Sequence, residues 1–331
     1  MYTPSDHRYE NMPYRRCGRS GLKLPAISLG FWRNFGGENP YSVMEEITLG
    51  AFDKGITYFD LANNYGNPHN GRAEENFGKI YANNLKPHRD EIVVATKAGF
   101  EMWAGPYGDR NGSRKYLLAS LDQSLKRMGL EYVDIYYHHV PDPETPVYET
   151  AMALDTAVRQ GKALYAGISN YCRSQAEEIT AALKELGTPF IVNQISYSMI
   201  NRWIENDRLD QWAIDNGVGL AVYSPLSQGL LSGKYNRNIP SDSRIGKGDS
   251  YLGRQLDDKT ISKLNKLAEI AENRGQSMSQ MALSWVLRNP AVATVIIGAS
   301  RFSQVEEDVA AINKLDFSED EMRAIEKALN D

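Results

Sequence analysis

The stretch Thr57-Tyr58-Phe59-Asp60-Leu61-Ala62-Asn63-Asn64-Tyr65-Gly66 decides how the chain folds and where its chemistry lies. The run Ile56–Phe59, which overlaps its beginning, is short, β-branched and aromatic, and it stands between Gly55 and a run of polar turn residues. This composition is typical of a buried strand that runs into a loop. The carboxylate of Asp60 therefore stands at the end of a strand, and the phenol of Tyr65 lies in the loop that follows.

The phenol of Tyr65 needs a neighbour that changes its pKa before it can exchange a proton efficiently near neutrality. Free tyrosine has a pKa of about 10, and an acid or base works best when its pKa lies near the working pH. Two later apolar runs end in suitable groups, one in Lys97 and one in His138-His139. A lysine beside Tyr65 would favour the phenolate, and Asp60 would keep that lysine charged and oriented. A neutral histidine would hydrogen-bond a substrate oxygen.

The apolar runs predict eight strands separated by amphipathic helical stretches. The runs are nearly continuous in hydrophobicity rather than alternating, which is typical of parallel strands covered by helices. The predicted strands are Ala26–Gly30, Ile56–Phe59, Glu91–Thr96, Tyr132–Tyr137, Leu164–Ile168, Phe190–Ile195, Gly219–Val222 and Ala293–Ile297.

The helical stretches carry start and stop signals. Ser113 can cap a helix that ends at Gly129. Ser277 and Gln280 form a capping-box pattern, and Pro290 stops the helix that follows.

Eight alternating units favour an α/β fold, the (β/α)8 or TIM barrel, which places chemistry at the C-terminal ends of its strands. A doubly wound sheet is the alternative, but no G-x-G-x-x-G follows the first strand. The length of 331 residues suits one large barrel. No repeat or low-complexity linker divides the chain, so we expect a single domain over residues 1–331.

Extra segments flank the predicted barrel. Tyr14–Arg16 and Leu22–Leu24 surround a glycine-containing turn and predict a β-hairpin. Residues 1–11 are polar and non-periodic, which predicts a loose arm. The long interval after the seventh strand predicts a Gly/Ser-rich loop over Ser227–Gly253 and a helix over Asp257–Arg274, and a further helix is expected at the C-terminus.

Composition excludes several classes of function. The net charge of −5, from 37 basic and 42 acidic residues, argues against nucleic acid or an anionic membrane as the main partner. Only Cys17 and Cys172 are present, so no disulfide framework exists and a cytoplasmic setting is expected. No apolar run reaches the ~18 residues of a membrane span. We expect no metal, because no ligand spacing joins the histidines to cysteines or carboxylates: His7, His69, His88, His138 and His139.

Several motifs resemble those of the aldo-keto reductases. They are Phe59-Asp60-x-Ala62-x-x-Tyr65-Gly66, Thr96-Lys97 and a histidine five residues after Asp134, in this order. The resemblance runs from about Met12 to the C-terminus. Within the family, "GSRKYLLASLDQSLKRMGLEYVDI" and "GQSMSQMALSW" are most similar to the bacterial L-glyceraldehyde 3-phosphate reductases, followed by the potassium-channel β-subunits.

The resemblance implies catalytic roles for four side chains. Tyr65 would be the general acid for carbonyl reduction, and Lys97 would lower its pKa. Asp60 would support Lys97, and His139 would orient the carbonyl. The side chain of His138 is expected to point to the opposite face of the strand from that of His139, and to be structural or supporting.

The resemblance also implies NADP(H) as the cofactor. Ser169, Asn170 and Gln194 would bond the nicotinamide amide, and Tyr223 would stack on the ring, since an aromatic face packs well on a flat ring. The loop from Ser224 would cover the pyrophosphate, because glycines allow close approach and basic side chains neutralise phosphate. The implied cofactor residues are Phe31, Trp32, Asp60, Ser169, Asn170, Gln194, Tyr223, Ser224, Pro225, Leu226, Gln228, Gly229, Lys234, Arg244, Gly298, Ser300, Gln304, Glu307 and Asp308.

Residues Gly298–Asp308 would hold the adenosine end of the cofactor. Position 308 is Asp where the family usually has Asn, which adds a carboxylate near the adenine. Ser300 with Arg301 still favours the 2′-phosphate of NADP over NAD.

The substrate pocket is expected around Tyr65 and His139, with Trp32 and Trp103 as walls. Tyr107 is a further candidate, and packing within loops is the competing interpretation for these aromatic residues. Four cations, Arg72, Arg110, Arg114 and Lys115, are candidates for binding a phosphorylated aldehyde, although solvated loop charges explain them equally well.

The expected function is therefore NADPH-dependent reduction of small aldehydes such as L-glyceraldehyde 3-phosphate or methylglyoxal. One alternative is an NADP-binding regulatory subunit of a membrane channel or transporter, which His139 argues against because the channel subunits carry Asn there. Another is a dehydrogenase that mainly oxidises alcohols. The relatives imply a homo-oligomer, a tetramer or larger.

Overall fold

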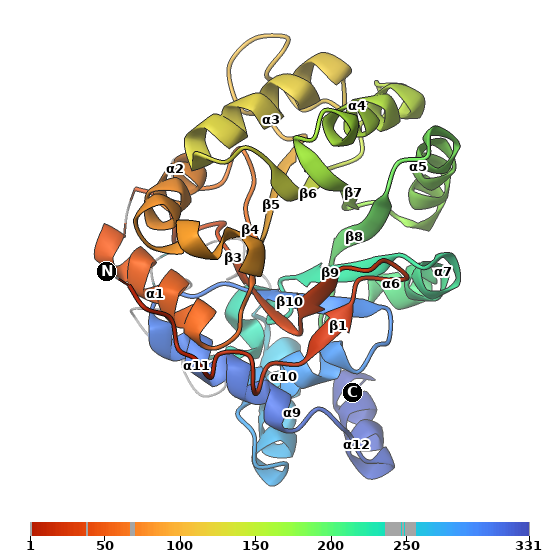
Figure 1. The fold of residues 1–331 in the computed structure, drawn as a ribbon. Helices are drawn as coiled ribbons and strands as arrows, with labels where there is room; N and C mark the ends of the chain where they lie inside the picture. Colours follow the sequence, from red (N-terminus) through yellow and green to blue (C-terminus); the bar gives the residue numbers. More distant parts are fainter. Residues whose placement is uncertain are drawn as a thin grey trace.

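The computed structural model describes residues 2–37, 39–66, 70–235, 246, 248 and 256–330. Its centre is a closed barrel of eight parallel strands in the order β10-β3-β4-β5-β6-β7-β8-β9, ringed by helices (Figure 1). The strands are β3 Ile27–Gly30, β4 Tyr58–Asp60, β5 Val93–Ala98, β6 Val133–His138, β7 Ala163–Ser169, β8 Phe190–Ser196, β9 Gly219–Tyr223 and β10 Val292–Ile297.

The predicted (β/α)8 barrel is confirmed, and so is each predicted strand to within a few residues. Pairing of β10 with β3 closes the sheet, with Val295 opposite Ile27 and Ile297 opposite Leu29. This closure excludes the doubly wound alternative, because an open sheet would leave both of these strands at edges.

Helices cover the outer face of the barrel. Predicted caps form at their ends: the Ser113 side chain accepts from the Tyr116 amide, and Ser277 with Gln280 forms a capping box. The α-helices are α1 Tyr41–Asp53, α2 Arg72–Ile80, α3 Arg114–Met128, α4 Val147–Arg159, α5 Arg173–Leu186, α6 Trp203–Asn206, α7 Leu209–Asn216, α9 Asp258–Asn273, α10 Met278–Leu287, α11 Phe302–Val309 and α12 Glu319–Asn330. The described residues also include shorter helical elements: the π-helix η1 Tyr81–Leu85 and the 3-10 helices η2 Lys86–Glu91, η3 Ser227–Ser232 and η4 Ala310–Asn313.

The hairpin predicted before the barrel is confirmed, and it lies at the N-terminal ends of the barrel strands. Strand β1, Tyr14–Arg16, pairs antiparallel with β2, Lys23–Pro25. Cys17 and Leu24 are fully buried and pack with side chains of the barrel interior. The hairpin therefore closes this end of the barrel with apolar side chains.

The N-terminal arm, expected to be loose, has neither helix nor strand in its described part, residues 2–11, but contacts elements that surround the barrel. The Tyr2 hydroxyl donates to Asp53 of α1 at 2.9 Å. Arg8 forms an ion pair with Glu91 at 2.5 Å, and Met12 is buried. The polar composition predicts a loose segment, whereas these side chains contact elements that come later in the chain.

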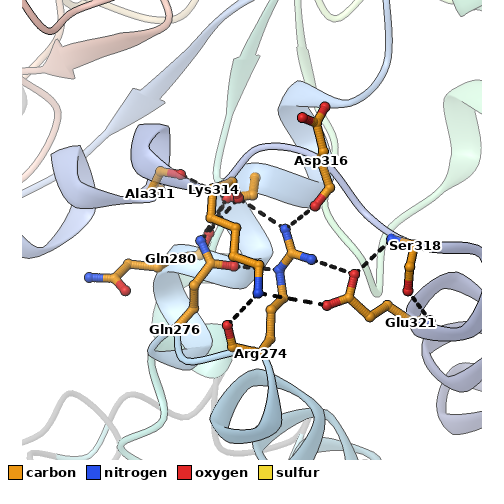
Figure 2. Close-up of polar contacts among 9 residues, drawn as sticks. Arg274, Gln276, Gln280, Ala311, Lys314, Asp316, Ser318 and Glu321 are labelled. Carbon is orange, nitrogen blue, oxygen red and sulfur yellow. Dashed lines mark hydrogen bonds and ion pairs between the residues drawn. The ribbon is translucent and has the colours of Figure 1, made fainter.

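A buried guanidinium is one of the groups that attach the C-terminal segment, and Figure 2 shows its contacts. Arg274, directly after α9, donates to the carbonyls of Lys314 and Asp316 and to the carboxylate of Glu321. Its side chain is fully buried and lies 3.7 Å from the centroid of the Phe317 ring. These contacts help to hold α12 against α9.

Candidate active site

The C-terminal ends of β4, β5 and β6 bring the predicted catalytic side chains together. Asp60 is the last residue of β4, Lys97 lies near the end of β5, and His139 directly follows β6. The Asn63 amide donates to the Lys97 carbonyl at 2.9 Å, which holds the loop after β4 against the end of the neighbouring strand β5. The Tyr65 hydroxyl therefore lies next to the Lys97 ammonium, although Tyr65 belongs to a loop.

Lys97 is the centre of the site. Its ammonium donates to Asp60 Oδ2 at 2.7 Å, to the Leu61 carbonyl at 2.6 Å and to the Tyr65 hydroxyl at 3.2 Å. Lys97 is fully buried, and Asp60 is 2% exposed. All three donors of the ammonium are thus used, which fixes its orientation.

Burial dominates the electrostatics of the site. It lowers the pKa of Lys97 below its ordinary value, and the Asp60 carboxylate acts in the opposite direction. Burial also holds the pKa of Tyr65 well above its ordinary value, with Asp60 adding to the rise. The predicted effect of Lys97 on Tyr65 stays a prediction: a nearby ammonium favours the phenolate, while burial, the largest influence on the pKa of this phenol, acts in the opposite direction.

His139 is a neutral imidazole. Burial, followed by the charge of Lys97, places its pKa well below the ordinary value. Its ring packs edge-on against Tyr65, with centroids 5.7 Å apart, and against Phe100 at 4.6 Å. His138 projects the other way, where its Nδ1 lies 2.6 Å from the Tyr171 hydroxyl.

Two phenols that sequence reasoning missed lie beneath Asp60. The Tyr58 hydroxyl donates to Asp60 Oδ1 at 3.1 Å and lies 2.9 Å from the hydroxyl of Tyr137. The available signal was the spacing of two residues between Tyr58 and Asp60, which puts both on the inner face of one strand.

The residues expected to bind the nicotinamide lie at the ends of β7, β8 and β9. Gln194 donates to Asp60 Oδ1 at 2.7 Å, and Asn170 donates to the His139 carbonyl at 2.9 Å. The Tyr223 hydroxyl donates to Asn170 Oδ1 at 2.7 Å. Ser169 precedes Asn170 at the end of β7 and is buried. Hydrogen bonds therefore link these residues to the predicted catalytic group.

The loop expected to cover the pyrophosphate has an unusual backbone. Ser224, Ser227 and Gln228 have φ values of 52°, 45° and 57°, in the left-handed region. A Cβ added at Gly229, or at Gly298 after β10, would meet no atom within 4 Å. Open backbone at both positions fits the close approach of a dinucleotide. Pro225, Leu226 and Lys234 belong to the same described loop, whereas Arg244 lies outside the described residues.

Phe31 is the predicted cofactor residue that the structure places elsewhere. Its side chain is fully buried, with the ring 3.9 Å from that of Phe35 and edge-on to Phe59 and Phe77. It belongs to the core and presents no side chain to a ligand. Trp32 is 39% exposed, and Arg33 lies 4.5 Å from its ring centroid.

The segment expected to hold the adenosine begins after β10 and continues into α11. The Ser300 amide donates to Gln304 at 2.8 Å, and Ser279 of α10 donates to Glu307 at 3.1 Å. Asp308 is 5% exposed, and burial, followed by the charge of Glu307, raises its pKa to about 7.

The other candidate substrate residues are aromatic side chains and cations, and their surroundings differ. Trp103 packs against Tyr116, with ring centroids 5.3 Å apart, whereas Tyr107 is 60% exposed. Among the cations, Arg110 donates to the Pro141 carbonyl at 3.0 Å and lies over the Phe100 ring. The other three contact groups on the helices or the loop: Arg72 with Glu75, Arg114 with Thr156 and Lys115 with Tyr107.

Two other kinds of feature are absent from the described ranges. No group of three or more His, Cys, Asp or Glu residues there could hold a metal ion. No described helix is long and apolar enough to cross a membrane.

The fold and this cluster define an oxidoreductase of a known class. The model of the aldo/keto reductase family matches residues 26–330, and the chain belongs to this family. Enzymes of the family generally use NAD(P)H.

Individual relatives cover nearly the whole chain. It is 50% identical over 335 residues to L-glyceraldehyde 3-phosphate reductase of Escherichia coli K12, covering 100% of this chain and 96% of the relative. It is 37% identical to a probable voltage-gated potassium channel subunit beta of Arabidopsis thaliana, covering 91% and 92%. A crystal structure of a thermostable aldo-keto reductase with the inhibitor epalrestat matches with a TM-score of 0.74 and 30% identity, covering 96% and 100%.

Proposed function

We propose that the protein reduces small aldehydes to alcohols with NADPH, with L-glyceraldehyde 3-phosphate and methylglyoxal-type carbonyls as substrates. One observation carries the proposal: the buried Lys97 ammonium contacts Asp60 and the Tyr65 hydroxyl at the same time, at 2.7 Å and 3.2 Å. The 50% identity to the reductase of E. coli supports the choice of substrate.

The side chains of the site then have distinct roles. The dinucleotide, when bound, supplies the hydride. Neutral His139 and protonated Tyr65 hydrogen-bond the carbonyl oxygen and orient it. Tyr65 keeps its hydrogen at neutral pH, since even free tyrosine has a pKa of about 10, and it donates that proton as negative charge develops on the oxygen. The Lys97 ammonium stabilises the phenolate that remains.

NADP(H) is the proposed cofactor, rather than NAD(H). Ser300 and Arg301, at the start of α11, are exposed polar and basic groups suited to a 2′-phosphate. Ser169, Asn170, Gln194 and Tyr223 would hold the nicotinamide.

Arg110 is the cation best suited to bind the phosphate of a triose phosphate. It stacks over Phe100, whose ring packs against His139. Its bond to the carbonyl of Pro141, two residues after His139, holds the guanidinium beside the end of β6. A guanidinium is well matched to phosphate oxygens, and Trp32 and Trp103 would form the walls of the pocket.

Replacing Tyr65 with Phe tests the proposed role of the phenol. Tyr65→Phe should abolish aldehyde turnover while NADPH still binds, as measured by cofactor fluorescence. Wild-type rates in this variant would refute the assignment. A panel of aldehydes including L-glyceraldehyde 3-phosphate and methylglyoxal, followed by NADPH consumption, identifies the substrate, and the ratio of forward to reverse rates tests the alcohol-oxidising alternative.

The similarity to potassium-channel β-subunits supports a second candidate, an NADP-binding regulatory subunit. Negligible activity over the aldehyde panel, together with capture of a membrane partner, would favour it. We further propose a cytoplasmic homo-oligomer, a tetramer or larger, which light scattering after gel filtration tests.

A further inference from the structure

Two phenols meet inside the barrel directly below the catalytic cluster. Tyr58 lies two residues before Asp60 on β4, and Tyr137 lies opposite Lys97 in the pairing of β5 with β6. Both side chains have no exposed surface. Tyr58 donates to Asp60 Oδ1 at 3.1 Å, and the two phenol oxygens are 2.9 Å apart.

The fold provides space for this pair. A Cβ at Gly167 of β7 would lie 2.6 Å from Cδ1 of Tyr137, so only glycine there leaves room for the ring. The surrounding side chains of the barrel interior include Val93, Ile135 and Ile191. A hydroxyl in such apolar surroundings is costly unless it is hydrogen-bonded, and each phenol has the other as a partner.

The direction of the hydrogen bonds follows from the chemistry of the groups. Burial holds the pKa of Tyr58 and of Tyr137 well above its ordinary value, so both phenols keep their hydrogens. An ionised carboxylate can only accept, so Tyr58 donates to Asp60. The hydroxyl of Tyr137 is then free to donate to the oxygen of Tyr58, and a chain of two donors runs up to the carboxylate.

We propose that Tyr58 and Tyr137 are positioning residues for the reaction. Asp60 Oδ1 receives hydrogen bonds from Tyr58 and Gln194, while Oδ2 receives one from Lys97. The phenols fix the carboxylate in the orientation that aims the Lys97 ammonium at the general acid. They touch neither substrate nor cofactor, and the inference rests on the proposed reductase function.

Three substitutions of tyrosine by phenylalanine test the inference, each removing one buried hydroxyl. Tyr58→Phe should lower kcat about tenfold, the effect of losing a hydrogen bond to a charged group, and leave the Kd for NADPH unchanged. Tyr137→Phe should have a smaller effect on kcat, because Tyr58 still donates to Asp60. Tyr136→Phe is the matched control: this hydroxyl is buried too, but donates to the Leu117 carbonyl at 2.6 Å, outside the barrel. It should lower the melting temperature and leave kcat unchanged.

A double-mutant cycle separates positioning from a general loss of structure. If Tyr58 acts through the carboxylate, Tyr58→Phe should cause no further loss of kcat in an Asp60→Asn background. A full tenfold loss in that background, wild-type kcat in Tyr58→Phe, or an equal loss in Tyr136→Phe would each overturn the inference. Activity retained by Tyr65→Phe would instead refute the proposed function, so the two failures are distinguishable.

Discussion

Replacing Asp308 with Asn should stabilise the protein, and the gain should grow as the pH rises. Asp308 lies on α11 with 5% of its surface exposed. Burial, and then the charge of Glu307, raises its pKa from 3.8 to about 7. The folded state therefore binds this proton more tightly than the unfolded state does. A group of this kind reduces stability as the pH rises from its unfolded pKa through its folded pKa.

The size of the effect follows from these two values. The whole difference between 3.8 and about 7 corresponds to about 4 kcal/mol of unfolding free energy. Between pH 5 and pH 8, about 3 kcal/mol of this should be lost by the wild type and retained by Asp308→Asn. With an unfolding entropy of about 2.1 cal/mol/K per residue, the melting temperatures of the two proteins should diverge by about 4 °C over that range.

Thermal melts of both proteins without cofactor, at half-unit steps from pH 5 to pH 8, measure this divergence. Only the difference between the two curves matters, because the other titrating groups are shared. A constant difference across the range would refute the reasoning, since it would mean that the Asp308 carboxyl does not change its charge there on folding.

Three further changes have expected outcomes. Lys97→Met should abolish turnover and cost about 3–5 kcal/mol in chemical denaturation, because it leaves the Asp60 carboxylate buried without its cation; unchanged stability would contradict this. Arg110→Met should raise KM for L-glyceraldehyde 3-phosphate about tenfold or more and leave that for unphosphorylated L-glyceraldehyde unchanged, with Arg114→Met as the control; equal changes for both substrates would exclude a phosphate contact. Arg274→Met should lower the unfolding free energy by about 3 kcal/mol with kcat unchanged, and a loss of kcat would mean that the C-terminal cluster reaches the site.

Much of the architecture could be predicted because buried parallel strands have continuous apolar sequences. Their boundaries were less predictable, since hydrogen bonds to neighbouring strands decide where a strand starts. The run beginning at Ile56 pairs only from Tyr58 onward, and the run expected from Glu91 pairs from Val93, after the turn η2.

The candidate catalytic cluster was predictable because its members follow successive strands, and the C-terminal ends of all strands of a parallel barrel lie on one face. Contacts that form only when the barrel closes could not be predicted. The spacing of Tyr58 and Asp60 puts both on one face of a strand, but it does not show that the Tyr137 hydroxyl meets that of Tyr58. Nothing in the sequence shows that the Phe31 ring turns into the core. The direction of the Tyr65 pKa also required the structure, because burial of the phenol is its largest cause.

The β-hairpin before the barrel has a consequence for the order in which reactants bind and leave. Cys17 and Leu24 pack on the side chains that fill the barrel interior, whereas Asp60, Lys97 and His139 lie at the opposite, C-terminal ends of the strands, so cofactor and substrate must reach the site from that one face. Whichever reactant settles deeper has to arrive first and depart last. We therefore expect cofactor and substrate to bind and leave in a fixed order, because the hairpin covers the N-terminal end of the barrel and both reactants share the C-terminal face.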